Sequence, residues 1–288
     1  MDKSLSIIIP AKNEESGLGV ILPELRKHYP DQEIIVVDDG STDGTVSVCH
    51  AHNVRVVSHP YSMGNGAAVK TGARIAGGEI LVFMDADGQH RPEEVAQLVE
   101  TLNQGFDMVV GARGNASQAS LGRLYANNFY NRVASWMTGH KIADLTSGFR
   151  AVVGTKFRDF LHLLPNGFSY PTTITMAFFR AGYAVSYVPI NAKSRLGKSH
   201  ISPIKDGVRF LLIIFRVGTL YSPLKLFLPI SLIFFFLGLG YYLYTYINTE
   251  RFTNMSALLF ISSILVFLIG LISEQITMLL YQRMTKDK

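Results

Sequence analysis

Two long apolar stretches, residues 224–247 and 257–280, limit what this chain can fold into more than any other feature. Each has about 24 residues, which as a helix is roughly 36 Å long, enough to cross a hydrocarbon core of about 30 Å with some tilt. A pair of buried core helices is the alternative, but each stretch holds a single charged residue, Lys225 or Glu274, over a length that few core helices reach. The pattern therefore predicts two membrane-spanning helices.

The charges around these stretches predict an orientation. Residues 248–256 between them carry one Arg and one Glu, whereas basic residues gather on the outer sides of the pair: Lys205, Arg209, Arg216 and Lys225 before it, and Arg283, Lys286 and Lys288 after it. Because basic residues favour the cytoplasmic face, we expect the N-terminal part and both termini to be cytosolic, with the hairpin in the cytoplasmic membrane. The first apolar run, residues 5–10, is too short and too early to be a signal peptide.

The segment before the hairpin, residues 203–222, mixes basic and apolar residues. This mixture is typical of amphipathic helices that lie at a membrane surface, although part of it can also pack under a globular domain. The formal net charge of +5 would fit a nucleic-acid partner. A basic segment beside two membrane spans is better explained by attraction to anionic headgroups, so we expect no nucleic acid.

The N-terminal part alternates short apolar runs with amphipathic segments. This alternation predicts strands over 6–10, 33–39, 54–58, 79–87 and 107–113, and helices over 16–28, 42–52, 65–76 and 92–104. Apolar strands linked by helices indicate an α/β fold with a mostly parallel sheet covered on both faces, which binds ligands at the carboxyl ends of its strands. We therefore expect a cytosolic α/β domain over 1–202, juxtamembrane helices over 203–222, and the hairpin with a short cytosolic tail over 223–288.

Carboxylates follow two of the predicted strands. Asp38 and Asp39 end the second strand, and Asp85 and Asp87 end the fourth. Two carboxylates at positions i and i+2 can offer hard oxygen ligands to one divalent cation, and Gln89 can add a third oxygen. Asp also commonly caps turns and helices, and we expect only a cap at Asp43. For Asp85 and Asp87 the position after a buried strand favours a metal site.

Other patterns exclude common chemistries. Residues 64–66, Gly-Asn-Gly, lack the ending of a P-loop and the spacing of a Rossmann fingerprint, so they fit a close backbone approach to a ligand or a helix start. The histidines show no paired spacing for zinc, and no nucleophile elbow supports Ser/His/Asp hydrolysis. The single cysteine, Cys49, fits a reducing compartment.

Five segments in order carry a family resemblance. They are SIIIPAKNE (6–14), VDDGSTDG (37–44), MDAD (84–87), GAR (111–113) and DLTSGFR (144–150). Together they resemble the polyprenyl-phosphate branch of glycosyltransferase family 2, which includes dolichyl-phosphate mannose synthases and bacterial polyprenyl-phosphate glucosyltransferases. The similarity covers about the first 200 residues, and several members of the branch also have a membrane hairpin. The resemblance implies a nucleotide-sugar-binding domain of the GT-A type.

The resemblance also implies roles for individual residues. Mg²⁺ or Mn²⁺ would be held against the donor diphosphate by Asp85, Asp87 and Gln89, and the residues near the reaction would be Asp87, Asp144 and Arg113. The residues implied for donor binding are Pro10, Ala11, Asn13, Glu14, Asp39, Asp85, Ala86, Asp87, Arg113 and Arg195.

The expected acceptor is a lipid phosphate. A sugar hydroxyl needs a positioned general base, whereas a phosphate monoester with a second pKa of about 6 is largely dianionic at neutral pH and needs mainly positive charge. The candidate clamps are Arg113, Arg123 and Arg195, with Lys198 and Ser199 as helpers, and for each a solvated surface position is the alternative. For Asp144 the alternative is a structural ion pair with Arg150.

Two departures bear on the sugar. Mannose synthases of the family commonly show Arg-x-x-Gly-x-Ser-Lys over the active site, whereas the run at 195–200 is one residue shorter and ends in His. Residues 170–176 lack the acidic and amide residues that we expect in a mannose synthase. Both differences weigh against mannose and GDP, and make glucose, N-acetylglucosamine or a uronic acid from a UDP donor at least as consistent with the sequence.

The expected function is therefore metal-dependent, inverting transfer of a hexose from a UDP- or GDP-sugar to undecaprenyl or dolichyl phosphate. A processive polysaccharide synthase is less consistent, because such enzymes usually carry Gln-x-x-Arg-Trp, while the only tryptophan here, Trp136, follows Ser135. A non-catalytic membrane scaffold is a third hypothesis, against which the paired aspartates argue. The oligomeric state stays open, and a homo-oligomer is compatible with the sequence.

Overall fold

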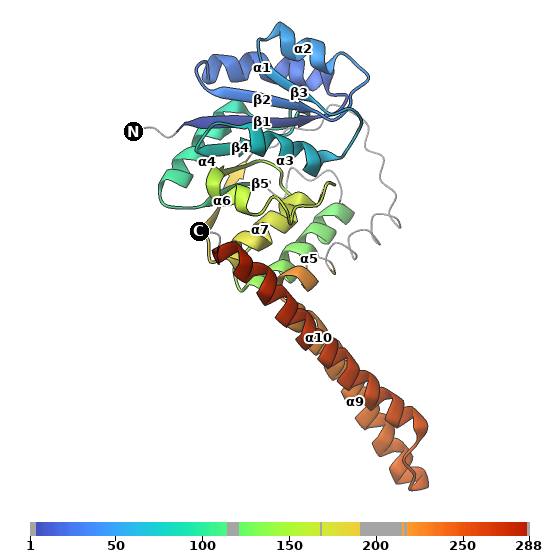
Figure 1. Cartoon of the computed structure of the whole chain (residues 1–288). Helices are drawn as coiled ribbons and strands as arrows, with labels where there is room; N and C mark the ends of the chain where they lie inside the picture. Colours follow the sequence, from blue (N-terminus) through green and yellow to red (C-terminus); the bar gives the residue numbers. More distant parts are fainter. Residues whose placement is uncertain (1–3, 114–120, 168, 191–214, 216–217, 287–288) are drawn as a thin grey trace. The chain divides into compact units, whose positions relative to one another are not determined.

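The computed structural model describes residues 4–113, 121–167, 169–190, 215 and 218–286, without the side chains of 121–127 and 280–286. The chain forms two compact units, residues 1–201 and 202–288. The first unit is an α/β domain and the second contains a helical hairpin (Figure 1).

A seven-stranded sheet organises the first unit, in the order β3-β2-β1-β4-β6-β5-β7. Only β6 runs antiparallel to its neighbours, so the predicted mostly parallel sheet is confirmed. The strands β6 and β7 lie in the region where the sequence patterns predicted no strand. The bounds are β1 (Leu5–Ala11), β2 (Glu33–Asp38), β3 (Arg55–Ser58), β4 (Ile80–Phe83), β5 (Met108–Arg113), β6 (Arg150–Val153) and β7 (Val185–Ile190).

Helices cover both faces of this sheet. Ile7 and Ile9 point into a buried cluster with Leu22 of α1 and Leu98 of α4. Ile8 points the other way, where a Cβ at Gly72 of α3 would lie 2.3 Å from its Cγ2 atom. Helices on both faces explain why every residue of β1 is buried, including Ser6. The helices are α1 (Glu15–His28), α2 (Thr45–Ala51), α3 (Asn65–Ile75), α4 (Pro92–Asn103), α5 (Leu121–Thr138), α6 (Gly154–Asp159) and α7 (Tyr170–Arg180).

The fourth strand is shorter than predicted. β4 ends at Phe83, although the Met84 amide still donates to the Ile8 carbonyl at 3.1 Å. The chain then leaves the sheet, so Asp85 and Asp87 lie in a turn and not in the strand. The acidic pair therefore projects beyond the edge of the sheet.

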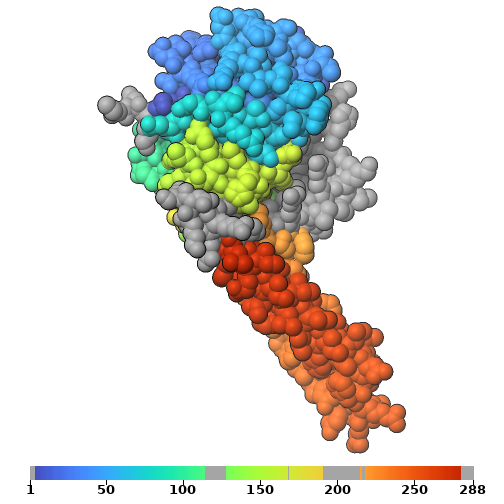
Figure 2. Space-filling view, in the orientation of Figure 1, coloured from blue at the N-terminus to red at the C-terminus, as the bar shows by residue number. Residues whose placement is uncertain are grey.

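The second unit contains two antiparallel helices, α9 (Pro223–Thr249) and α10 (Asn254–Lys286), packed side by side along their length (Figure 2). The apolar parts, Pro223–Thr249 and Asn254–Leu279, have mean hydropathies of 2.1 and 2.6. Ser231 and Ser263 each donate a hydroxyl hydrogen bond to the other's carbonyl, both at 2.9 Å. Long apolar helices joined by buried polar contacts confirm the predicted transmembrane hairpin. Most of the predicted juxtamembrane segment, 203–222, lies outside the described residues.

Candidate active site at the carboxyl edge of the sheet

A cavity of about 410 Å³ opens where β1, β2 and β4 end. Seven of the ten residues expected at the donor line it: Pro10, Ala11, Glu14, Asp39, Asp85, Ala86 and Asp87. Residues that were not among the candidate site residues complete the lining: Lys12, Ser62, Gly64, Asn65, Ala68, Thr146, Gly148, Tyr170 and Pro171. Apart from Lys12, which follows β1, they come from the β3–α3 connection, α3, the loop before β6 and the start of α7, segments that only the tertiary fold brings together.

The acidic turn, residues 85–87, is fixed by close backbone packing. A Cβ at Gly17 would lie 2.1 Å from the Ala86 carbonyl oxygen, so only glycine lets α1 approach this turn. The Gln89 amide donates to Asp87 Oδ1 at 3.2 Å. Gly148 closes the other side, since a Cβ there would lie 3.0 Å from Asp85 Oδ1.

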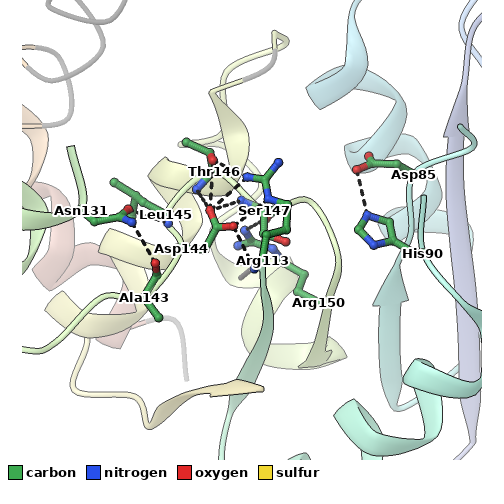
Figure 3. Close-up of polar contacts among 10 residues, drawn as sticks. All are labelled: Asp85, His90, Arg113, Asn131, Ala143, Asp144, Leu145, Thr146, Ser147 and Arg150. Atoms are coloured by element: carbon green, nitrogen blue, oxygen red, sulfur yellow. Dashed lines mark hydrogen bonds and ion pairs between the residues drawn. The ribbon is translucent and has the colours of Figure 1, made fainter. Parts of the chain in front are cut away.

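His90 contacts the carboxylate of Asp85, the first residue of this turn. Its Nε2 atom is 3.5 Å from Asp85 Oδ2 (Figure 3). Its ring stacks on Phe149, with the ring centroids 4.6 Å apart and an interplanar angle of 14°. Burial alone would raise the pKa of Asp85, but the contact with His90 and the charges of His90, Arg113 and Arg150 outweigh burial and lower it. No periodic pattern predicted the role of His90, because its ring packs against Phe149, which is distant in sequence and directly precedes β6.

The donor set of the acidic turn fits a divalent cation. The Asp85 side chain is 37% exposed and, like Asp87, lines the cavity, whereas His90 behind it is only 4% exposed. Two carboxylates on one side of a cavity offer the hard oxygens that Mg²⁺ and Mn²⁺ prefer. Gln89 does not line the cavity, so its role as a third ligand stays a prediction.

Asp39 is the centre of a hydrogen-bond network on the opposite side. One carboxylate oxygen accepts from His59 Nδ1 at 2.8 Å and from the Met63 amide at 2.7 Å. The other accepts from Ser62 Oγ at 2.8 Å and from the Gly64 amide at 2.9 Å. Burial raises the pKa of Asp39, but these hydrogen bonds more than offset it and lower the pKa. Asp39 therefore anchors the segment 62–64 of the cavity wall.

Two neighbouring residues support turns and do not line the cavity. The side-chain oxygen of Asn13, Oδ1, accepts a hydrogen bond from the Thr42 amide at 2.8 Å. Asn13 has a φ of 55°. Asp43 accepts from the Thr45 amide at 3.0 Å at the start of α2, as expected for a cap. Asn13 thus shapes the wall indirectly, and its predicted donor contact stays a prediction.

The Gly-Asn-Gly segment begins α3 and packs closely on backbone. A Cβ at Gly64 or Gly66 would lie within 2.4 Å of a carbonyl oxygen in the loop 165–167, and Gly64 has a φ of +103°. The close approach that the glycines allow is thus to this loop. Between them, Asn65 Oδ1 is buried, lines the cavity and has no hydrogen-bond partner among the described residues. A buried acceptor of this kind needs a donor from a ligand or water.

Arg113 and Asp144 form a paired cluster beside the cavity. Arg113 donates through Nε to Asp144 Oδ2 at 2.8 Å, and through a terminal nitrogen to Asp144 Oδ1 at 3.1 Å and to Thr146 Oγ1 at 2.6 Å (Figure 3). Burial opposes ionisation of both groups, but the pair lowers the pKa of Asp144 and raises that of Arg113. Thr146 connects this cluster to the cavity lining.

The alternative ion pair between Asp144 and Arg150 is wrong. Arg150 is fully buried and donates to the Pro171 carbonyl and to Thr175 Oγ1, both at 3.2 Å, and to the Ser147 carbonyl. Arg113 takes the Asp144 carboxylate because β5 ends beside the loop that precedes β6. Arg150 instead ties β6 to the start of α7.

The remaining acceptor candidates are not placed. The backbone of Arg123 belongs to α5, but its side chain lies outside the described part of the chain. Arg195, Lys198 and Ser199 also lie outside the described residues. One further group with metal-ligand spacing, Glu24, His28 and Glu93, is exposed and does not line the cavity.

Comparison with known proteins places both units in families. Residues 6–160 match the model of glycosyl transferase family 2, and residues 222–279 match the GtrB C-terminal hairpin. The chain is 31% identical to polyprenol monophosphomannose synthase of Mycolicibacterium smegmatis over 68% of this chain and 80% of that protein. It is 32% identical to undecaprenyl-phosphate mannosyltransferase of Micrococcus luteus, over 68% of this chain and 86% of that protein. A dolichyl-phosphate hexose transferase of Haloferax volcanii is 26% identical, with 70% and 89% covered.

Solved structures support the fold. Glucosyl-3-phosphoglycerate synthase of Mycobacterium tuberculosis, in complex with Mn²⁺, UDP and glucosyl-3-phosphoglycerate, matches with a TM-score of 0.61 and 21% identity, covering 75% of this chain and 79% of that chain. The same enzyme with Mg²⁺ and UDP has a TM-score of 0.61. The expected GT-A fold is thereby confirmed. The chain is a glycosyltransferase of family 2 and carries a C-terminal hairpin of the GtrB type.

Proposed function

We propose that this protein transfers a hexose from a nucleoside-diphosphate sugar to a polyprenyl phosphate at the cytoplasmic face of a membrane. The observation that carries the proposal is the cavity lined by Asp85 and Asp87, beside the Arg113 cluster, in a chain that also has a membrane hairpin. Relatives named for transfer to polyprenyl, undecaprenyl and dolichyl phosphates support the acceptor class.

Asp85 and Asp87 would hold Mg²⁺ or Mn²⁺ against the donor diphosphate. When bound, the cation supplies positive charge that stabilises the nucleoside diphosphate as it leaves. His90 keeps the Asp85 carboxylate in place from behind, and Gly148 keeps the space in front of it open. The nucleoside would bind at the wall that Asp39 anchors. This wall includes Asn65 Oδ1, which has no hydrogen-bond partner among the described residues.

Arg113 would attract the phosphate of the acceptor or of the donor. Its guanidinium is held by Asp144 and Thr146, so its direction is fixed before a substrate arrives. We assign Asp144 a positioning role and not that of a base. Its lowered pKa makes it a poor proton acceptor, and a dianionic phosphate needs no base.

The proposed chemistry is a single in-line displacement. The lipid phosphate oxygen attacks the anomeric carbon as the bond to the nucleoside diphosphate breaks, so an α-linked donor gives a β-linked product. This assignment rests on the family resemblance and on an acceptor that is itself a nucleophile. Coupling constants of the anomeric proton in the purified product test it, and an α-linkage would contradict it.

The donor is a UDP- or GDP-hexose. The shortened run at 195–200 argues against mannose, while two relatives are named for mannosyl transfer, so both nucleotides belong in the test. The proposed orientation places both termini and the first unit on the cytoplasmic side, as the basic flanks of the hairpin indicate.

The direct test uses the purified full chain, a short polyprenyl phosphate, Mg²⁺ or Mn²⁺ and a panel of labelled UDP- and GDP-sugars. We expect one donor to label the organic-extractable lipid. Asp87→Asn should lower the transfer by about 10²-fold or more, whereas Asp31→Asn, at an exposed position before β2, should leave it unchanged. Polymer formation would instead indicate a processive synthase, and absence of metal-dependent donor binding would indicate a scaffold.

A further inference from the structure

One face of α5 exposes large aromatic side chains. Phe129 is 60% exposed and Trp136 is 54% exposed, and Arg132 between them is also exposed. The spacing of three, four and seven residues places all three on the same side of the helix. The opposite side is buried through Tyr130, Ala134 and Met137 and fixes α5 to the first unit.

This exposure is unusual within the first unit. Among its described residues the exposed large hydrophobic side chains are Val20, Tyr61, Met63, Phe129 and Trp136. Tyr61 and Met63 flank Ser62 at the cavity, which leaves two aromatic rings grouped on α5 without a role in the site. Exposed apolar side chains that are grouped on a surface commonly mark a site of contact with a protein or a membrane.

The charged residues of α5 and of the segment that follows it, 139–143, have one sign. Residues 121–143 contain Arg123, Arg132, His140 and Lys141 but no Asp or Glu. Arg132 and Lys141 are exposed. A surface that combines Trp, Phe and basic side chains suits the boundary of a bilayer, where rings lie among the headgroups and cations attract anionic lipids.

We propose that the α5 face, defined by Phe129, Arg132 and Trp136, is a second membrane contact that lies among anionic lipid headgroups. A bilayer is available to this face because the same chain carries two apolar helices long enough to span one. The contact would limit the movement of the catalytic unit over the membrane and thus present its cavity to lipid-borne substrates. The inference does not depend on the proposed donor or acceptor.

The chain offers a built-in probe, because Trp136 is its only tryptophan. The full chain is reconstituted in vesicles of phosphatidylcholine and phosphatidylglycerol without polyprenyl phosphate, and Trp emission is measured with nitroxide-labelled headgroups and with aqueous iodide. For a ring among the headgroups we expect about a twofold loss of emission with labelled headgroups and weak iodide quenching. Strong iodide quenching without lipid quenching would overturn the proposal.

A matched variant tests whether the contact is specific. Trp136→Phe combined with Val20→Trp moves the single tryptophan to α1, which lies far from α5 within the first unit, at a position that is 60% exposed (Figure 1). This tryptophan should be quenched by iodide and not by labelled headgroups, and equal lipid quenching at both positions would contradict the assignment.

A second copy of the chain is the competing occupant of the α5 face. In that case Trp136 would be shielded from both quenchers, which would overturn the lipid contact. Arg132→Gln tests the electrostatic part, since Trp136 quenching by labelled headgroups should then depend less on the phosphatidylglycerol fraction. An unchanged dependence on that fraction would remove Arg132 from the contact.

Discussion

The acidic wall of the cavity and the Arg113 cluster beside it, here called the basic wall, are built in different ways. The acidic wall comes from residues 85–90, close together in sequence, and its shape depends on close packing of the Ala86 backbone against Gly17 and of the Asp85 side chain against Gly148. The basic wall joins Arg113 to Asp144, which are 31 positions apart, and its shape depends on an ion pair. The acidic wall should therefore be sensitive to added volume, and the basic wall to a change of charge.

The largest effect should come from Asp87→Asn. Loss of one carboxylate removes a hard ligand and a charge from the acidic wall, so transfer should fall by about 10²-fold or more. Donor binding, measured by calorimetry with and without Mn²⁺, should lose its dependence on the metal. Retained metal dependence would mean that the cation binds elsewhere.

Gly17→Ala tests whether volume controls the acidic wall. The new methyl group would clash with the Ala86 carbonyl and displace the turn, and a shift of about 1 Å can cost about 10²-fold in rate. Gly19→Ala is the matched control, because a Cβ there meets nothing within 4 Å. Equal rates for the two variants, at equal thermal stability, would show that the packing of the turn does not matter.

Asp144→Asn tests the basic wall. It leaves the partly buried Arg113 without its counter-charge, and we expect a loss of about 2–3 kcal/mol in the free energy of unfolding. The KM for the lipid acceptor should rise more than kcat falls, since Asp144 is assigned a positioning role. A normal acceptor KM with a collapsed kcat would favour a base instead.

The contribution of ionised Asp144 to the free energy of unfolding should depend on pH. The folded-state pKa of Asp144 is lower than its ordinary value of 3.8, so its stabilisation is fully present above 3.8 and is lost as the pH falls through the folded-state pKa. Denaturant unfolding above and below pH 3.8 should therefore show a steeper decline for the unmodified protein than for Asp144→Asn. Parallel declines would exclude a linked ionisation at this residue.

The smallest effect should come from His90→Phe. A phenyl ring can keep the stack on Phe149 but cannot contact the Asp85 carboxylate. Because residues behind metal ligands typically tune affinity, the dissociation constant for Mn²⁺ should rise about tenfold while the melting temperature changes little. An unchanged dissociation constant would mean that His90 only fills space.

The sequence predicted the local parts of this structure well. Strands β1 to β5 and the hairpin follow from runs of neighbouring residues with a periodic or apolar pattern, whereas the residues on the donor side were implied by the family resemblance. The predicted strand over 79–87 is too long, because β4 ends at Phe83 and the turn at 85–87 packs against α1 at Gly17. The position of a strand end depends on such contacts and not on the apolar pattern.

The parts that were missed depend on distant residues. Asp144 pairs with Arg113 and not with the nearby Arg150, because strand order and not sequence distance decides which cation is adjacent. His90, Thr146 and Tyr170 become part of the site only when β6 inserts between β4 and β5. No single-sequence pattern encodes that insertion.

We propose that the acidic wall binds the cation of a nucleotide-sugar site. Its most direct test is the anomalous scattering of Mn²⁺ in crystals of the full chain grown with UDP or GDP. We predict a peak at ligand distance from Asp85 and Asp87, next to the diphosphate. A peak only at the exposed Glu24, His28 and Glu93 group, or a bound nucleotide without a cation at the acidic wall, would contradict the account.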